Sequence, residues 1–311
     1  KLFPFLFLAF RSTQAVSSFS YFLKKPIEIP GLGILKFNIH ENQPGINPIL
    51  KLLALKKLPP AGWIKVSGTK IEEEDKESSF DIELSCRYDK LFPVDDESVI
   101  YPRVLSFDIE ANSTITSAMP NAERPNDKIF QIGCVSSIKG VKQKHLFSLG
   151  NPDPKIVGGD VELRTYKTEA DLIVSLTDFI REKEFNIIIG YNILSWDFHY
   201  MISRSKFNRC ISEFSKIGCL NGVNDVEVAP KFESKAYGAQ KLIYLDSEGR
   251  LYLDLLPIIS REHKLVNYRL KTVTTHFGLP TKDPLTAQDI FKCYRDFTPD
   301  SLGIVGKYCV Q

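Results

Sequence analysis

The sequence predicts an α/β fold with a mixed sheet, preceded by a smaller, β-rich α+β domain. Two observations predict it. From Arg103 onward, strand-like apolar runs alternate with helical patterns, as they do in α/β proteins. Before that point, short apolar runs are separated by clusters of Pro and Gly, which is typical of short strands joined by turns. We therefore expect one domain at residues 1–100 and a second at residues 101–311.

The first hundred residues show three strand-like runs, at 3–10, 33–39 and 62–67. The stretch "NPILKLLALKKL" between them has helical spacing. The apolar opening "LFPFLFLAF" is too short to span a bilayer and lacks a small-residue cleavage site, so we expect a buried strand and no membrane contact.

The second part of the chain alternates between the two periodicities. In chain order, the expected elements are the strands "RVLSFDIEA", "KIFQIGCVSSI" and "KHLFSLG", a helix opened by Thr168, the buried strand "FNIIIGYN", the helix "SWDFHYMISRSKF", the strand "RLYLDLLPII" and the helix "LKTVTTHFGL" ending at Gly278.

The composition is that of a globular protein long enough for two domains. Of its 311 residues, 43% are hydrophobic and 25% are charged, and the formal net charge is +2. This near-balance excludes a global positive field, so any contact with nucleic acid has to come from local patches. The six cysteines form no CxxC pair and no zinc spacing with His, which predicts buried, reduced thiols in an intracellular compartment.

The stretch "VLSFDIE" at residues 104–110 carries two carboxylates on one expected strand. Because side chains alternate along a strand, Asp108 and Glu110 share one face, while Phe107 and Ile109 share the other. Two such carboxylates repel each other and are costly to bury unless a cation lies between them. The alternative is the exposed half of an amphipathic strand.

A third carboxylate, Asp197, opens the helix that follows "GYNILSW". By itself it could be a first-turn or capping residue that the helix dipole favours. Taken with Asp108 and Glu110 it favours a metal site, because oxygen ligands without His or Cys suit Mg²⁺ or Mn²⁺. Two such ions, roughly 4 Å apart, can activate water and stabilise the leaving oxygen of a phosphodiester.

Three short segments resemble the exonuclease motifs of family B DNA polymerases. "FDIE", "YNILSWD" and "YCVQ" are similar, in this order, to Asp-x-Glu, Asn-x₃-(Phe/Tyr)-Asp and Tyr-x₃-Asp. Trp196 is a mild departure at the aromatic position. The third motif begins at Tyr308, and its Asp would follow Gln311, so we expect a chain truncated within that motif. The passage "MPNAERPNDKIFQIG" resembles the delta-like polymerases of eukaryotes and large DNA viruses.

This resemblance implies a ribonuclease H-like 3′–5′ exonuclease domain at 101–311, after the N-terminal domain of the family. Carried over by residue, Asp108 and Glu110 would bind two Mg²⁺ ions, for which Mn²⁺ substitutes, and Asp197 would hold the second ion. Tyr308 would orient the attacking water. Asn192 would position the 3′ end of DNA.

Two of these residues have simpler interpretations. Tyr308 could be an ordinary aromatic on a helix face, and Asn192 a turn former. For Asp254, in "YLDLL", we expect hydrogen bonds at a strand end rather than a metal contact. No His is followed by an Asp five residues later, which favours the Tyr type of exonuclease.

The resemblance also implies the partners of the parent protein. They are a DNA primer-template with a frayed single-stranded 3′ end and a processivity factor, in the nucleus or at a viral replication site. No polymerase motif occurs in these 311 residues, and without the fourth carboxylate we expect weak or no exonuclease activity from them. The alternatives are a free-standing DEDD-type exonuclease on RNA or DNA, and a non-catalytic DNA-binding module.

Overall fold

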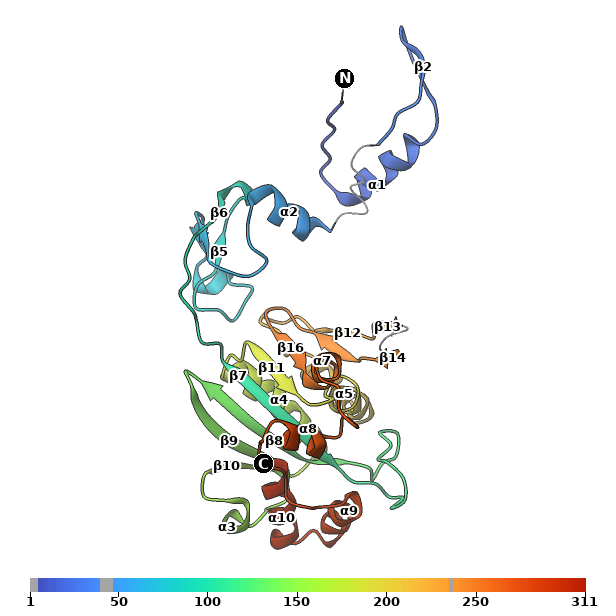
Figure 1. The fold of residues 1–311 in the computed structure, drawn as a ribbon. Coiled ribbons are helices and arrows are strands. Elements are labelled where there is room, and N and C mark those ends of the chain that lie inside the picture. The colour runs from blue at the N-terminus through green and yellow to red at the C-terminus, as the bar shows by residue number, and fades with distance from the viewer. Residues whose placement is uncertain (1–4, 40–46, 235–237) are drawn as a thin grey trace. The chain divides into compact units, whose positions relative to one another are not determined.

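The structure is a computed structural model that describes residues 5–39, 47–234 and 238–311, without the side chains of 231–241 (Figure 1). The chain divides into two units by its internal contacts. The first unit contains residues 1–75 and 82–98, and the second contains residues 76–81 and 99–311. Each unit is described by itself.

The described part of the first unit combines two α-helices with small antiparallel strand pairs. Ser12 caps the first helix, and Asn47, followed by Pro48, begins the second, as N-caps and N1 prolines commonly do. The helix expected from "NPILKLLALKKL" is confirmed. The elements are α1 Thr13–Phe22, β1 Ile27–Ile29, β2 Gly33–Leu35, α2 Pro48–Lys56, β3 Ile64–Val66, β4 Thr69–Lys70, η2 Glu73–Asp75, β5 Leu84–Ser85, η3 Tyr88–Lys90 and β6 Leu91–Pro93, with β1 paired to β2, β3 to β6 and β4 to β5.

The expected buried strand at 3–10 is wrong where the structure describes it. Residues 1–4 lie outside the described residues, and residues 5–10 form no strand. Phe5 and Phe7 are 71% and 87% exposed. A strand needs a neighbouring backbone to complete its ladder, and apolar composition alone does not supply one. The expected strands at 33–39 and 62–67 are present but shorter, as β2 and β3.

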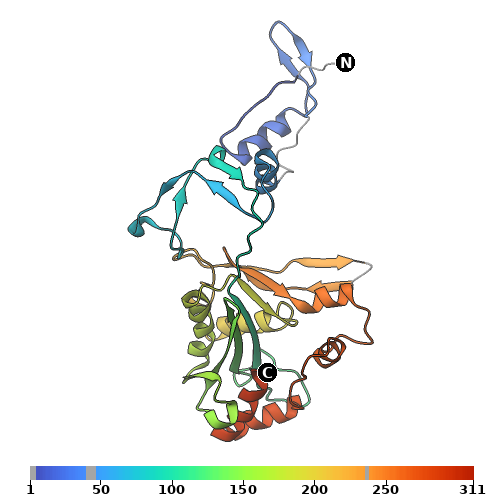
Figure 2. The same cartoon turned by 60° about the vertical axis from the view of Figure 1, so that its left-hand side comes forward.

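The second unit is built on a mixed six-stranded sheet (Figure 2). Its strands, in spatial order, are β10 Val161–Tyr166, β9 Val141–Leu149, β8 Ile129–Ile138, β7 Val104–Ala111, β11 Ile187–Gly190 and β16 Leu251–Asp254. β8 is antiparallel to both β7 and β9, whereas β10 is parallel to β9, and β7, β11 and β16 are parallel to one another. The predicted α/β class and mixed sheet are confirmed.

Helices cover the two faces of this sheet. α4 Glu169–Glu182 and α5 Asp197–Phe207 pack on the face that carries Phe107 and Phe147, where Phe198 and Phe179 meet these rings at 5.3 Å each. Thr168 caps α4, as predicted. The opposite face receives α10 Pro299–Cys309, which contacts β7, β8 and β9. In both views α10 gathers with α3 Pro154–Val157 and α9 Ala287–Asp296 (Figure 1, Figure 2).

Two glycines let α10 approach the sheet closely. A Cβ at Gly133 of β8 would lie 2.6 Å from the carbonyl oxygen of Cys309, so a larger residue would displace the helix. A Cβ added at Gly306 of α10 would clash with Cδ2 of Leu146, at the end of a buried side chain of β9. These two small residues therefore set the height of α10 above the sheet.

For the remaining elements of the second unit, one prediction is corrected and several elements were not predicted. The run "RLYLDLLPII" is not one strand, because Asp254 ends β16 and caps α7, whose first turn contains Pro257. The elements β10, α3, α9 and α10 were not predicted. The other elements are α6 Ile211–Phe214, β12 Val226–Val228, β13 Lys231–Ser234, β14 Gly238–Lys241, β15 Tyr244–Asp246, α7 Leu255–Glu262 and α8 Leu270–His276, of which only α8 was predicted as it is found.

The cysteines and the helix lengths complete the fold. All six cysteines are free, as predicted, and four are buried, but Cys86 is exposed and Cys293 is half-buried. Among the described residues, no helix has the length and apolar character needed to cross a membrane.

Candidate active site

Strand β7 presents Asp108 and Glu110 on the face that α10 covers. The antiparallel register sets Asp108 opposite Gly133 and Glu110 opposite Gln131. Phe107, on the other face, packs against Phe198 of α5. The predicted division of this strand into a carboxylate face and an apolar face is therefore confirmed. Glu110 is 8% exposed, so the strand is not the exposed half of an amphipathic sheet at this point.

Asp197 is the first residue of α5 and reaches across to strand β7. Its Oδ1 accepts a hydrogen bond from the backbone N–H of Ile109 at 3.2 Å, and the residue is 2% exposed. Trp196, the residue before the helix, provides no side-chain cap. The structure thus places Asp197 beside the backbone that lies between Asp108 and Glu110.

The electrostatics of these carboxyl groups follow from burial and mutual repulsion. Burial raises the pKa of Glu110 to about 8, and the charge of Asp108 adds to the rise, while Lys282 opposes it. Burial also raises the pKa of Asp197, again with a contribution from Asp108, and the N–H of Ile109 opposes that rise. Burial and repulsion therefore oppose the ionised forms of both groups, and a further cation nearby would favour those forms.

Lys282 supplies one cation, and no pattern in the sequence pointed to it. Its Nζ lies 2.6 Å from Oδ2 of Asp108, and its side chain is 19% exposed. Burial by itself would lower the pKa of Lys282, but the charge and hydrogen bond of Asp108, together with the nearby Cys309 and Glu110, raise it. The next residue, Asp283, exchanges two hydrogen bonds with the side chain of Gln311, at 2.8 and 3.0 Å. These bonds hold the segment between α8 and α9 beside the end of α10.

Helix α10 brings Tyr308 to the same place. The ammonium of Lys282 lies 4.7 Å from the centre of the Tyr308 ring, within the range of a cation–π contact. Burial raises the pKa of Tyr308, and Glu110 contributes to that rise. The next residue, Cys309, directs its thiol to the carbonyl oxygen of Asp108 at 3.7 Å. Tyr308 is therefore a neighbour of the carboxylates rather than an aromatic on a remote helix face.

Asn192 lies in the turn that joins β11 to α5. Its φ is 67°, a left-handed conformation that Asn tolerates better than most residues, and its carbonyl accepts from the N–H groups of Ser195 and Trp196. Asp254 holds this turn, because its carboxylate accepts from the N–H groups of Asn192 and Leu194 at 2.8 and 3.1 Å. The hydrogen-bonding role predicted for Asp254 at the strand end is confirmed.

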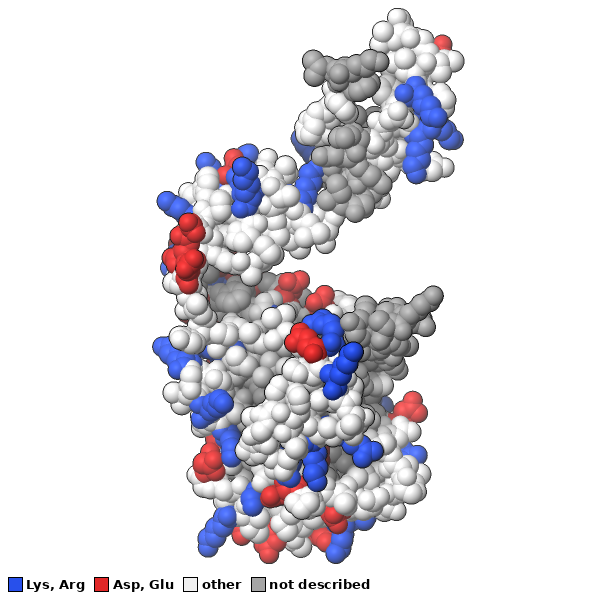
Figure 3. Space-filling model, in the orientation of Figure 1, with Lys and Arg blue, Asp and Glu red and all other residues white. Residues whose placement is uncertain are grey.

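The donor chemistry of the site suits a hard divalent cation, because its acidic groups are all carboxylates. The arrangement of these described groups, however, does not by itself provide such a site. Within residues 5–39, 47–234 and 238–311, no three His, Cys, Asp or Glu side chains are grouped so as to hold a metal ion. The ammonium of Lys282 lies at Asp108 instead. On the face shown in Figure 3, Lys and Arg are interspersed with Asp and Glu.

Comparison with known proteins identifies the family. The sequence model of the family B DNA polymerase exonuclease domain matches residues 43–273. The chain belongs to this family. The match includes Asp108, Glu110 and Asp197 and ends before Lys282 and Tyr308.

DNA polymerases of viruses and plants are similar to the chain along most of its length. It is 38% identical to DNA polymerase 120R of Invertebrate iridescent virus 3, covering 100% of this chain and 29% of that protein. It is 34% identical to DNA polymerase 037L of Invertebrate iridescent virus 6, covering 95% and 25%. It is 31% identical to the DNA polymerase delta catalytic subunit of Glycine max, covering 88% and 25%.

These relatives confirm the resemblance to delta-like polymerases of eukaryotes and large DNA viruses. The chain spans between 25% and 29% of the length of these three DNA polymerases.

Proposed function

We propose that this chain is the proofreading part of a replicative DNA-directed DNA polymerase, and that it hydrolyses the 3′-terminal phosphodiester of DNA. The observation that carries the proposal is the contact of Asp197 with the N–H of Ile109, because it joins two separate elements around three carboxylates. The order and mix of the six strands support a ribonuclease H-like class for this domain.

Asp108, Glu110 and Asp197 would hold two divalent cations, Mg²⁺ or in its place Mn²⁺. When bound, these ions would supply Lewis-acid activation of water and stabilisation of the leaving oxygen. Burial and, to a smaller extent, mutual repulsion raise the pKa of Glu110 and Asp197, and a cation would relieve the repulsion. Lys282 competes for Oδ2 of Asp108, so binding of a cation there requires its ammonium to move away.

The remaining residues would act on the substrate. The hydroxyl of Tyr308 would orient the attacking water by a hydrogen bond. Asn192, whose backbone is fixed by Asp254, would position the terminal nucleotide. The substrate would be the frayed single-stranded 3′ end of a primer-template, since a mispaired end unpairs at a lower cost than a paired one. A processivity factor, and a nuclear or viral replication site, are proposed for the parent polymerase.

A nuclease assay tests the proposal in the gene product that contains residues 1–311. With Mg²⁺ and 3′-labelled single-stranded DNA, we expect Asp108→Asn and Glu110→Gln to lower the hydrolysis rate by about 100-fold or more. The matched control is Asp178→Asn, which neutralises an exposed carboxylate on α4 whose charged neighbour is Arg181. Equal rates for the site variants and the wild type would refute the assignment.

A non-catalytic DNA-binding module is the second candidate. It is favoured by the ion pair of Lys282 with Asp108, which neutralises one carboxylate without a metal. Titration with Mn²⁺ separates the two functions. The module predicts no Mn²⁺ binding and unchanged DNA affinity in Asp108→Asn, whereas the exonuclease predicts Mn²⁺ binding that this substitution weakens. A free-standing exonuclease would lack primer extension in the same gene product.

A further inference from the structure

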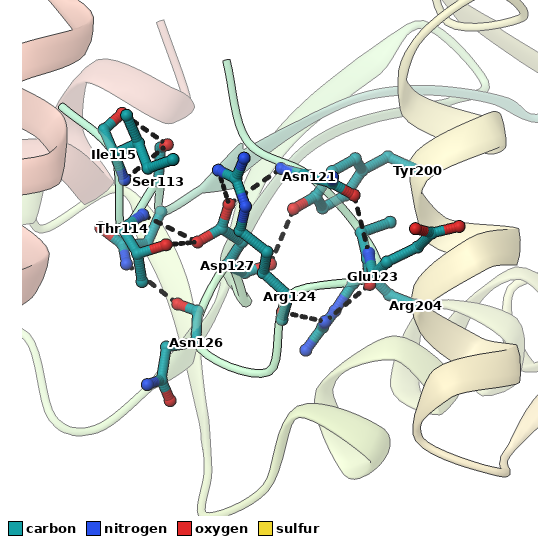
Figure 4. A network of polar contacts seen from close by, with 12 residues as sticks. Ser113, Thr114, Ile115, Asn121, Glu123, Arg124, Asn126, Asp127, Tyr200 and Arg204 are labelled. Carbon is teal, nitrogen blue, oxygen red and sulfur yellow. Dashed lines mark hydrogen bonds and ion pairs between the residues drawn. The ribbon is translucent and has the colours of Figure 1, made fainter. Parts of the chain in front are cut away.

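Buried polar contacts attach α5 to the loop between β7 and β8, residues 112–128, here called the β7–β8 loop (Figure 4). The hydroxyl of Tyr200 donates to the carbonyl oxygen of Asp127 at 2.7 Å. One turn later, Nη1 of Arg204 donates to the carbonyl oxygens of Ala122 and Arg124 at 2.9 and 2.8 Å. Helix α5 is therefore held to this loop at two successive turns.

Arg204 also joins the loop to two further elements. It is fully buried, and Nε and Nη2 donate to the carboxylate of Glu169, the first residue of α4. Nη2 also reaches the carbonyl oxygen of Pro125, so all five N–H groups of the guanidinium have acceptors. Glu169 in turn accepts from the N–H of Ile129, the first residue of β8, at 2.8 Å.

The loop is itself braced around Asp127, which is fully buried. The Asp127 carboxylate accepts from the N–H and hydroxyl of Thr114, both at 2.7 Å, and from the N–H of Asn121 at 2.9 Å. These bonds tie the two halves of the loop together. The start of the loop, next to the end of β7, is therefore hydrogen-bonded to the end of the loop that contacts α5.

Helix geometry connects these contacts to the candidate active site. Asp197, Tyr200 and Arg204 follow one another at spacings of three and four residues, so they share one face of α5. The β7–β8 loop begins two residues after Glu110. One end of this helix face thus carries a site carboxylate, and the other is fixed to the continuation of the strand that carries Glu110.

We propose that Tyr200 and Arg204 are positioning residues that fix Asp197 relative to Asp108 and Glu110. The cation-binding part of this inference rests on the proposed function. Residues that orient metal ligands typically change metal affinity or activity by about 10- to 100-fold when they are substituted. A role in stability alone would leave the affinity for the cation and the contact between Asp197 and Ile109 unchanged.

The test compares two single-hydroxyl deletions. Tyr200→Phe removes the bond to Asp127, and Thr177→Val removes a buried hydroxyl bond from α4 to the carbonyl oxygen of Phe214 at 2.8 Å. Three quantities are measured for each variant: the melting temperature, the Mn²⁺ dissociation constant by calorimetry, and hydrogen exchange of the Ile109 amide without metal. We expect similar losses in melting temperature, but only Tyr200→Phe should weaken Mn²⁺ binding, by about tenfold, and speed exchange at Ile109.

Arg204→Lys provides a second variant that keeps the charge but loses the fork of hydrogen bonds. If Arg204→Lys folds, we expect it to weaken Mn²⁺ binding and to speed exchange at Ile109 by more than Tyr200→Phe does. If it does not fold, the result for Tyr200→Phe decides between positioning and stability alone. Wild-type Mn²⁺ affinity and wild-type exchange at Ile109 in Tyr200→Phe would overturn the proposal. Failure of the proposed function is distinguishable, because wild-type protein would then not bind Mn²⁺, while exchange at Ile109 would still report the positioning of Asp197.

Discussion

Lys282 and Asp108 lie 174 residues apart in the sequence, yet the ammonium of one is 2.6 Å from the carboxylate of the other. This pair places a protein cation at a carboxylate that we propose as a metal ligand. Lys282 also faces the ring of Tyr308 at 4.7 Å. Lys282 therefore contacts both Asp108 on β7 and Tyr308 on α10.

Lys282→Met should strengthen Mn²⁺ binding, because it removes the cation that competes for Asp108. In the metal-free protein the loss of the ion pair should cost less than about 1 kcal/mol, since the Asp108 side chain is 45% exposed. Calorimetry measures the first effect and urea unfolding the second. Lys307→Met is the control, because Lys307 pairs with Asp283 at 3.4 Å and not with Asp108. Weaker Mn²⁺ binding in Lys282→Met would contradict the competition.

Glu110→Gln should stabilise the metal-free protein at neutral pH. The folded-state pKa of Glu110 is raised from 4.5 to about 8, so its ionisation favours unfolding. The stability that the protonated Glu110 side chain contributes is fully present below about pH 4.5 and is lost as the pH rises to about 8. One pKa unit corresponds to about 1.4 kcal/mol, so the gain in Glu110→Gln is at most several kcal/mol.

Chemical unfolding between pH 4.5 and 8, with EDTA present, measures this effect. We expect the pH dependence to be flatter in Glu110→Gln than in the wild type. Addition of Mn²⁺ should raise the free energy of unfolding of the wild type, and should raise that of Glu110→Gln much less. Parallel pH profiles for the two proteins would show that burial of Glu110 carries no such cost.

Asp254→Asn should loosen the turn that carries Asn192. The Asp254 carboxylate accepts from Asn192, Leu194 and Leu256, and an amide nitrogen at one of its oxygen positions cannot accept. A buried N–H left without its acceptor costs about 1–3 kcal/mol, measured as a loss in the free energy of unfolding. Asp246→Asn, at an exposed position on β15, should change it by less than about 0.5 kcal/mol.

The elements that could be predicted are those whose pattern is local. Strand β7 could be predicted with its two faces because Phe107 and Ile109 alternate with Asp108 and Glu110. Helix α4 could be predicted because Thr168 caps an apolar stripe. These signals lie within a few residues of the element that they describe, so no tertiary information was needed.

Two of the features that were missed depend on contacts between distant segments. Lys282 lies in a segment without periodicity, and only folding brings it to Asp108. The run at 3–10 is apolar, but its sequence does not indicate which other segment would pair with it as a strand. The division of "RLYLDLLPII" did carry a local signal, since Asp254 precedes a helix with Pro257 in its first turn. The apolar run that continues through this boundary masks that signal.

Gly133→Ala should destabilise the protein and displace Tyr308. The added Cβ would lie 2.6 Å from the carbonyl oxygen of Cys309, so α10 must move away from β8. Overpacking of this kind typically costs about 1–3 kcal/mol. Gly159→Ala is the matched control, because a Cβ there meets nothing within 4 Å. Thermal unfolding measures the cost, and hydrogen exchange of the α10 amides reports the displacement of the helix. Equal stability of the two variants would mean that α10 adjusts its height above the sheet at no cost, and that the close approach at Gly133 does not hold Tyr308 in place.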